Sequence, residues 1–376
     1  MAAAFTEESG MPSAGCLSHS LQLVIKSDLF GLPSVEKLIE KVKKVVSFAN
    51  HSDKFYLELR KQQRLHMEEG EKELNLIQDV TTRWNSTFYM LERFLRLKIP
   101  LLSSMANSED VKVEMRNDDW KLLTKVVTVL KCFEEATTRL SNKSASISLT
   151  IPIVNIIIKQ LEALKDDFGV KTLKRDLQHA MEVRFDGIED DEKYTLATFL
   201  DPRFKGLLFR KKETLKNVKE QLVRLLVKGM EDLESDHNMN VNSEMDESGD
   251  FHGMEKSGGS QDMEENTKPK GSFASTLAKI IEQNTQVQET SKENEAIQFV
   301  NEYAKSKVIE SSDEKESFEQ TLEFWRSKAS SMNPMDKVAA KLAEYYLCPP
   351  ATSVDVERLF STAGDIRTQE SLKMLV

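Results

Sequence analysis

The sequence is poor in cysteine. Its 376 residues include only three, Cys16, Cys132 and Cys348, which are odd in number and far apart. Such a set does not form the disulfide framework that staples small secreted domains. We therefore expect the protein to work in a reducing, intracellular compartment.

Long apolar runs are also absent. No window approaches the roughly 18 uncharged apolar residues that a membrane span needs. Residues 1–15 contain acids and small polar residues, whereas a secretory signal has a basic segment followed by an apolar one. We expect these residues to form a disordered tail, and the protein to be soluble and without a membrane partner.

Positive charge is in deficit as well. Lys and Arg total 52 against 62 Asp and Glu, which gives a net charge of −10. The field of the whole molecule therefore does not attract phosphate, and any contact with DNA must be local. Apolar residues make up 39% and charged residues 30%, which is ordinary for a globular protein with a packed core.

Apolar residues at helical spacing run through most of the chain. They predict a short first helix after Cys16, which ends at Gly31-Leu32-Pro33, and a longer amphipathic helix capped by Ser34. Residues 74–80 alternate in part and are the best candidate for a strand. Further helices are predicted over residues 84–102, 120–140, 151–168, 172–185 and 215–233.

The composition changes in the second half of the chain. Residues 234–272 are rich in Gly, Ser, Asn, Asp and Glu, which predicts an acidic disordered linker. Helical spacing returns over 273–366, where Pro349-Pro350 ends one helix and a short last helix follows. Glu357 and Arg358 flank its apolar stripe, and taken alone they indicate a surface ion pair. The stripe consists of Val356, Leu359, Phe360 and Ala363.

The run YYLCPPATSVDVERLFSTAGDI, residues 345–366, resembles the C-terminal dimerisation signature of hAT-superfamily transposases and of host proteins derived from them, including BED-type zinc-finger proteins. Three more segments match in the same order. CLSHSLQLVI (16–25) resembles the family's Cys-x-x-His helix, DVTTRWNSTFYML (79–91) its Arg-Trp segment, and LATFLDPRFKGLLF (196–209) a block of its helical insertion. Together they span most of the chain after residue 15.

The resemblance implies a fold class: a mainly α protein that keeps a remnant of an RNase H-like α/β core, with a large all-helical insertion. The implied domains are a disordered tail (1–15), a partial RNase H-like core (16–90), an all-helical insertion (91–233), the acidic linker (234–272) and a C-terminal dimerisation region (273–376).

The family cleaves phosphodiester bonds with three carboxylates that hold divalent metals. The resemblance places the third at Glu357 and the first two on strands near or before the Cys-x-x-His helix. Residues 1–15 lack the alternation of a strand, and Glu7 and Glu8 are their only acids. We therefore expect an N-terminally truncated relative in which Glu357 is a relic, with no enzymatic activity and no cofactor.

Two other pairs of residues are candidate sites. Cys16 and His19 have zinc-ligand spacing, but structural zinc takes four protein ligands, and the sequence offers no complementary pair, so no metal site is predicted. Trp84 is by itself an ordinary core aromatic at the start of a helix. The resemblance adds that Arg83 and Trp84 are candidates for DNA contact, with Arg83 on phosphate and Trp84 stacked on an unstacked base.

One short motif stands apart from these. Val111-Lys112-Val113-Glu114 fits the apolar-Lys-x-Glu pattern of SUMO attachment. The pattern is short enough to occur often by chance, so the sequence alone assigns it no function.

The function predicted from the resemblance is that of a catalytically inactive, domesticated hAT transposase-like protein in the nucleus, which forms a homodimer and associates with DNA and other nuclear proteins. One alternative is an active DNA transposase or nuclease fragment. A second is a helical adaptor with no DNA contact. The residues predicted to dimerise are Leu342, Tyr345, Tyr346, Val356, Leu359 and Phe360.

Overall fold

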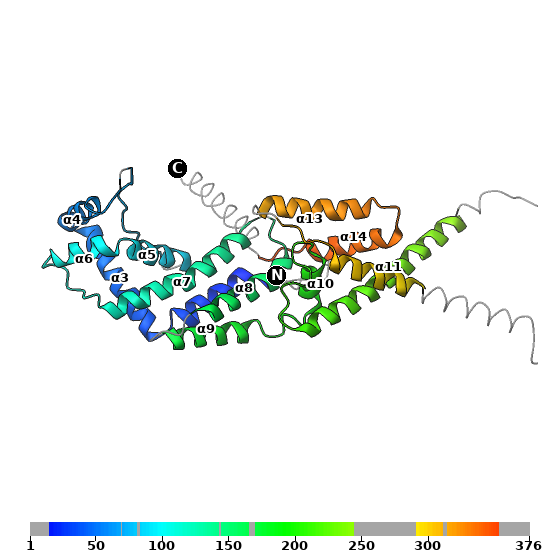
Figure 1. The fold of residues 1–376 in the computed structure, drawn as a ribbon, viewed down its shortest axis with the longest axis horizontal. Helices are drawn as coiled ribbons and strands as arrows, with labels where there is room; N and C mark the ends of the chain where they lie inside the picture. The colour runs from blue at the N-terminus through cyan, green and yellow to red at the C-terminus, as the bar shows by residue number, and fades with distance from the viewer. Residues whose placement is uncertain are drawn as a thin grey trace, which may run out of the picture. The chain divides into compact units, whose positions relative to one another are not determined.

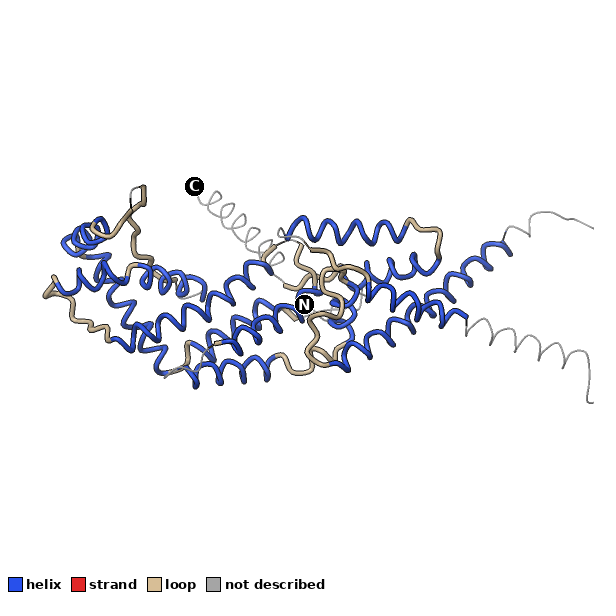
Figure 2. The backbone as a smooth tube through the Cα atoms, in the orientation of Figure 1, coloured by secondary structure: helices blue, strands red, loops and turns tan. Residues whose placement is uncertain are grey.

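The computed structural model describes residues 15–68, 70–80, 83–142, 144–164, 170–243, 291–310 and 314–352. These residues form helices joined by loops, without a β-strand among them (Figures 1 and 2). The prediction of a mainly α protein is confirmed. The α/β remnant of an RNase H-like core that the resemblance implies is not seen in this part of the chain.

The chain divides into two compact units. Unit 1 comprises the described parts of Met1–Thr198, Leu207–Arg210 and Tyr346–Val376, and unit 2 those of Phe199–Gly206 and Lys211–Tyr345. Unit 1 includes helices on both sides of residue 90, and the domain boundary expected there stays a prediction.

Unit 1 begins with α2 (Leu17–Leu23), which continues into the π-helix η1 (Val24–Leu29). This is the short first helix that the sequence predicts. Next, α3 (Pro33–His51) starts one residue before the expected cap, Ser34, because Pro33 occupies its first turn. A proline suits that position, since its φ is helical and its missing N–H would have no partner there.

The helix α4 (Asp53–Arg64) begins after Ser52, whose Oγ accepts a hydrogen bond from the Phe55 amide at 3.3 Å. The single helix expected over 84–102 is two, α5 (Trp84–Arg96) and α6 (Lys98–Ala106). Pro100 explains the break, because it has no N–H to donate to the carbonyl four residues earlier and its ring crowds that turn.

The remaining helices of unit 1 follow the predicted pattern. They are α7 (Asn117–Leu140), the 3-10 turn η2 (Ile147–Leu149), α8 (Thr150–Ala163), α9 (Val170–Arg184) and the start of α10 (Glu192–Leu200). The helix α7 packs against α2, α3, α5 and α8, while α9 packs against η1 and α8 (Figure 1). None of the described helices has the length and apolarity needed to cross a membrane.

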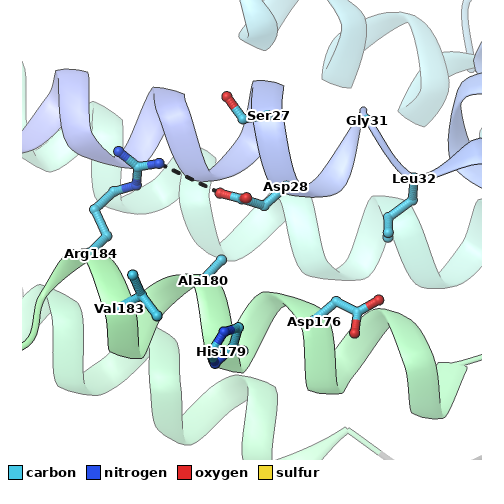
Figure 3. A pocket seen from close by; sticks show the side chains of 9 residues that line it. All are labelled: Ser27, Asp28, Gly31, Leu32, Asp176, His179, Ala180, Val183 and Arg184. Atoms are coloured by element: carbon cyan, nitrogen blue, oxygen red, sulfur yellow. Dashed lines mark ion pairs between the residues drawn. The ribbon is translucent and has the colours of Figure 1, made fainter.

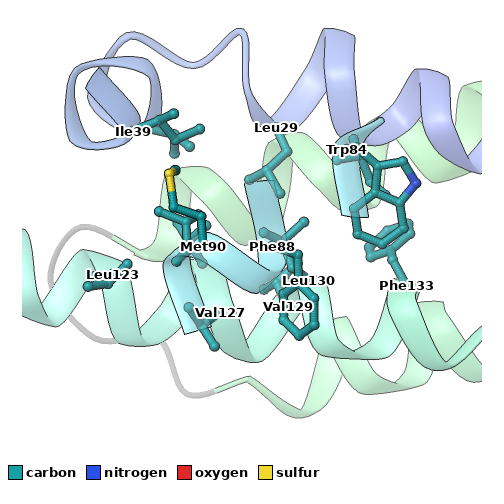
Figure 4. Close-up of a cluster of buried hydrophobic side chains, with 14 of the residues drawn as sticks. Leu29, Ile39, Trp84, Phe88, Met90, Leu123, Val127, Val129, Leu130 and Phe133 are labelled. Atoms are coloured by element: carbon teal, nitrogen blue, oxygen red, sulfur yellow. The ribbon is translucent and has the colours of Figure 1, made fainter. Parts of the chain in front are cut away.

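The core of unit 1 is mainly aliphatic, with a few aromatic rings. Its side chains come from η1, α3, α5 and α7 and interleave between the helices (Figure 4). Each large apolar side chain removed from water contributes roughly 1.5–3 kcal/mol. Fully buried examples are Leu29, Met90, Leu123, Leu130 and Phe133.

The strand predicted at residues 74–80 is wrong. The segment is irregular, and the Gln63 side chain takes the place of a neighbouring strand: its Oε1 accepts from the Leu74 amide at 2.8 Å, and its Nε2 donates to the Leu74 carbonyl at 3.0 Å. Arg93 donates to the Asn75 carbonyl at 2.7 Å. The alternation in the sequence reflects apolar side chains such as Leu76 that pack inward on helices.

Unit 2 contains α11 (Lys212–Ser243), a helix over residues 291–305, α13 (Glu314–Ala329) and α14 (Pro334–Leu347). The helix α11 continues to Ser243, so the first part of the expected linker is helical, and residues 244–272 lie outside the described residues. As predicted, α14 ends before Pro349-Pro350. Gly229 of α11 lies where Val338 of α14 approaches closely, and a Cβ there would collide with it.

Candidate functional site

The beginning of the C-terminal signature docks onto the first helix of unit 1. The Leu17 amide donates to the Ala351 carbonyl at 3.1 Å, and the Ala351 amide donates to the Ala145 carbonyl at 3.0 Å. The Ile147 amide donates to the Pro349 carbonyl at 2.8 Å. Two of the segments that carry the resemblance, 16–25 and 345–366, therefore meet in space although they lie at opposite ends of the sequence.

The contact also caps two helices. The first amides of a helix have no partner inside it, and the side chain of Cys16, the N-cap residue of α2, accepts no hydrogen bond from them. The Ala351 carbonyl supplies a partner for the first of them. At the other end of this contact, Thr352 Oγ1 donates to the carbonyl of Leu140, the last residue of α7, at 3.4 Å. The signature thus begins as a structural brace of unit 1.

The Arg-Trp segment forms a tight corner at the start of α5. The Asp79 carboxylate is 3% exposed, lies 2.7 Å from Lys43 Nζ of α3, and accepts from Thr87 Oγ1 at 3.3 Å. The hydroxyl of Ser86 accepts from the Val80 amide at 2.9 Å. These contacts fix the direction in which α5 leaves the irregular segment before it.

The two DNA-contact candidates differ in exposure. Trp84 is 3% exposed and belongs to the core of unit 1 (Figure 4). A base needs an open aromatic face to stack on, so the placement of Trp84 agrees with the interpretation as an ordinary core aromatic. Arg83, the N-cap residue of α5, is exposed at the helix end whose dipole favours anions.

The zinc-ligand candidates lie on α2 and just before it. Cys16 is half-buried and His19 is exposed. Within the described residues, no three His, Cys, Asp or Glu side chains come together in an arrangement that could hold a metal ion.

The residues predicted to dimerise are described only in part. On α14, Tyr345 is 41% exposed, Leu342 is half-buried and Tyr346 is buried. Of these three, Tyr345 is the most exposed. The other predicted residues, Val356, Leu359 and Phe360, lie outside the described residues together with the candidate relic Glu357.

A groove between η1 and α9 was missed by the sequence reasoning. It has a volume of about 660 Å³ and is lined by acidic, basic and apolar side chains (Figure 3). Arg184 Nη2 lies 3.8 Å from Asp28 Oδ2, and His179 and Val183 border the same groove. No signal in the apolar spacing could have found it, because a π-helix widens the turn by one residue without a change in composition.

Comparison with known proteins agrees with the resemblance to the hAT family that the four sequence segments indicate. Residues 14–129 match the family described as "ZBED1 RNase-like helical domain". Zinc finger BED domain-containing protein 4 of Homo sapiens is 30% identical over 235 residues, 61% of this chain and 20% of that protein. Zinc finger BED domain-containing protein 6 of Mus musculus is 26% identical over 376 residues, 97% of this chain and 36% of that protein. The Putative AC transposase of Zea mays is 30% identical over 203 residues, 51% of this chain and 24% of its own length.

The chain is similar to zinc finger BED proteins and to a putative AC transposase, as the resemblance to the hAT family predicts. It spans between 20% and 36% of the length of the three relatives compared. The family match covers α2 to the middle of α7 and so includes the corner of Asp79 and Trp84. The Cys-x-x-His helix and the Arg-Trp segment therefore both lie within the matched part of unit 1.

The segment of resemblance at 196–209 lies outside this match, and its residues 199–206 belong to unit 2, where they include a polar loop. Arg203 Nη2 donates to Asp201 Oδ2 at 2.6 Å, and the two side chains are only 9% and 1% exposed. The buried Lys205 Nζ donates to the Ser306 carbonyl and to Ser306 Oγ, both at 2.6 Å, at the end of the helix over 291–305. Burial lowers the pKa of Lys205. The block thus holds unit 2 together.

Proposed function

We propose that this chain is a catalytically inactive protein derived from a hAT transposase, which acts in the nucleus through self-association and through contact with DNA and other nuclear proteins. Its kinship supports the proposal, because its relatives include both a transposase and zinc finger BED proteins. From the same kinship we infer that its helices descend from the surroundings of an RNase H-like core.

The burial of the Asp79 and Trp84 side chains is the observation that carries the proposal. Asp79 is engaged by Lys43 of α3 and Thr87 of α5, and Trp84 is 3% exposed in the core of unit 1. Asp79 thus links α3 to α5 and Trp84 fills the core, so these two side chains are not open to a substrate, whereas Arg83 is exposed. The arrangement favours a scaffold over a reaction centre.

Self-association is assigned to the surface around Tyr345. A large, accessible aromatic side chain on α14 suits an interface. Tyr345 lies shortly before the brace formed by residues 349–351 in the sequence. Sedimentation velocity should show a concentration-dependent dimer that Tyr345→Ala weakens by about tenfold or more. Tyr89→Ala is the matched control, because Tyr89 is 40% exposed on unit 1. A wild-type chain that stays monomeric at high micromolar concentration would contradict the assignment.

DNA contact is assigned to Arg83. Loss of one phosphate contact should weaken binding about equally for all sequences and reduce the salt slope by about one in Arg83→Ala. Arg116→Ala is a close control, since Arg116 is the N-cap residue of α7 and its side chain is exposed. A chain that binds no duplex even at low salt would instead fit the alternative of a helical adaptor without DNA contact.

The absence of catalysis is tested directly. The chain, supplied with Mg²⁺ or Mn²⁺ and a DNA hairpin, should neither nick nor transfer a strand. Cleavage that disappears in Glu357→Gln would establish the alternative of an active transposase or nuclease and overturn this part of the proposal.

A further inference from the structure

The SUMO-type motif lies in the connection between α6 and α7. Residues 107–116 join Ala106, the end of α6, to Asn117, the start of α7, and residues 111–116 form neither helix nor strand. Val111-Lys112-Val113-Glu114 occupies the middle of this connection. A conjugating enzyme that reads four consecutive side chains needs them on an accessible, non-helical backbone, and the motif meets this requirement without any unwinding.

The side chains of the motif alternate in their surroundings. Val111 and Val113 are half-buried and pack against the core of unit 1, whereas Lys112 and Glu114 are exposed. This is the alternation of an extended chain, in which successive side chains point to opposite sides. The lysine and the acid therefore share the outward face, and the packing of the two valines holds the segment in place.

We propose that Lys112 is a site of covalent attachment for a ubiquitin-like modifier of the SUMO class. Val111 keeps part of its side chain at the surface for an apolar contact, and Glu114 supplies the negative charge that the pattern requires. A segment that is already ordered and extended loses less conformational entropy on binding than a flexible tail does. The proposal is independent of DNA binding and of dimerisation.

The residues around the motif leave the Glu114 carboxylate accessible to a conjugating enzyme. Its nearest cation is Arg116, whose Nε lies 3.6 Å from Glu114 Oε2. Both side chains are largely exposed. An exposed pair of this kind contributes little, so the Glu114 carboxylate can exchange Arg116 for a cationic group of the enzyme.

The chemical step is an acyl transfer. The modifier arrives as a thioester between its C-terminal carboxyl group and the cysteine of the conjugating enzyme. The uncharged amine of Lys112 attacks the thioester carbonyl, an isopeptide bond forms, the carbon–sulfur bond breaks, and the cysteine leaves as a thiolate. The proton that the amine loses passes to solvent or to the thiolate. The ATP-dependent activating enzyme supplies the energy when it forms the thioester beforehand.

The nearby Lys121 provides a matched control. It is exposed, like Lys112, but it lies within α7 and its Nζ is 3.4 Å from Asp118 Oδ1. It follows Trp120 and precedes Leu122 and Leu123, so it has no acid two residues later. A preference for Lys112 over Lys121 would therefore reflect the motif and its backbone, and not exposure alone.

The experiment is a reconstituted conjugation reaction with the full chain, activating enzyme, conjugating enzyme, modifier and ATP, followed by gel shift and mass mapping. One adduct is expected in the wild type and in Lys121→Arg, and none in Lys112→Arg. Glu114→Gln keeps the shape but removes the charge, and should slow conjugation about tenfold, the effect of losing one charge-assisted hydrogen bond. Melting temperatures of all variants should match, since the substituted side chains are exposed.

Two results would overturn the proposal. An adduct that persists in Lys112→Arg places the modification elsewhere. A free peptide with the sequence of residues 107–116 that is conjugated while the intact chain is not would mean that the fold withholds the motif, with Val111 too deeply packed to be read.

Discussion

The two units of the chain are stabilised in different ways. Unit 1 is a stack of helices whose core is mainly aliphatic. In unit 2, aromatic rings lie next to buried charged groups. The ring of Tyr303 contacts those of Phe199 and Trp325, and Lys205 Nζ lies 4.9 Å from the Tyr303 ring centre. Trp325 Nε1 donates to the Leu200 carbonyl at 3.0 Å. Aliphatic packing tolerates small shifts, whereas hydrogen bonds and cation–ring contacts have directions.

The difference follows from how each unit is assembled. Most of unit 1 comes from one continuous stretch of sequence, while the described helices of unit 2 come from segments on both sides of residues 244–290. Lys205 and Ser306 are 101 positions apart. Apolar contact is non-directional, so it does not by itself fix how two segments distant in sequence align with each other. The hydrogen bonds of the polar loop of Asp201, Arg203 and Lys205 are directional and can fix this alignment.

The largest effect is expected from the buried ion pair of unit 2. Asp201→Ala leaves the Arg203 guanidinium buried and unpaired, which should lower the free energy of unfolding by about 3–5 kcal/mol. Asp79→Ala is the counterpart in unit 1 and should cost only about 1–2 kcal/mol, because Lys43 is 35% exposed and can turn to water. Denaturant titrations measure both. Equal losses would show that the units do not differ in their use of charge.

A core truncation tests whether the units unfold separately. Leu130→Ala should destabilise unit 1 by about 2–5 kcal/mol, since Leu130 is fully buried in its core. Hydrogen exchange should then accelerate in α5 and α7 and stay unchanged in α13. Faster exchange in both units would mean that they form one cooperative structure.

A smaller change, an increase in the free energy of unfolding, is expected from a substitution at Tyr303. Its hydroxyl is buried and makes no hydrogen bond to the described residues. Removal of an unsatisfied polar group is favourable, so Tyr303→Phe should raise the free energy of unfolding by about 1 kcal/mol. In unit 1, Tyr56 Oη donates to Asn75 Oδ1 at 2.7 Å, and Tyr56→Phe should lower stability by about 0.5–1 kcal/mol. A loss of stability in Tyr303→Phe would indicate a partner for its hydroxyl.

The smallest effect is a pH dependence in unit 1. Tyr89 Oη donates to Glu134 Oε1 at 2.7 Å, and this hydrogen bond, with burial, raises the pKa of Tyr89 from 10.0 to about 12. Above pH 10 the unfolded chain loses this proton first, so the folded state holds more protons and its stability falls as pH rises to about 12. Tyr89→Phe should flatten this part of the stability curve. An unchanged slope in the variant would assign the dependence to other groups.

The sequence by itself determined the helices and most of their ends. Apolar residues at helical spacing predict them because each helix must bury one face, and Pro33, Pro100 and Pro349-Pro350 mark local breaks that proline geometry imposes. Pro100 was available as a signal for the separation of α5 from α6, although apolar spacing alone joins them. The four segments of resemblance were visible as well, since they are runs of consecutive residues.

The tertiary structure alone decided how these segments are used. Spacing could not tell whether residues 74–80 meet a strand or the side chain of Gln63, because both satisfy the same backbone groups. Nor could it tell that Trp84 is buried while Arg83 is exposed, or that Ala351 caps α2 from the far end of the chain. The physical reason is that periodicity describes one element at a time, whereas burial and hydrogen-bond partners depend on what the other elements bring to it.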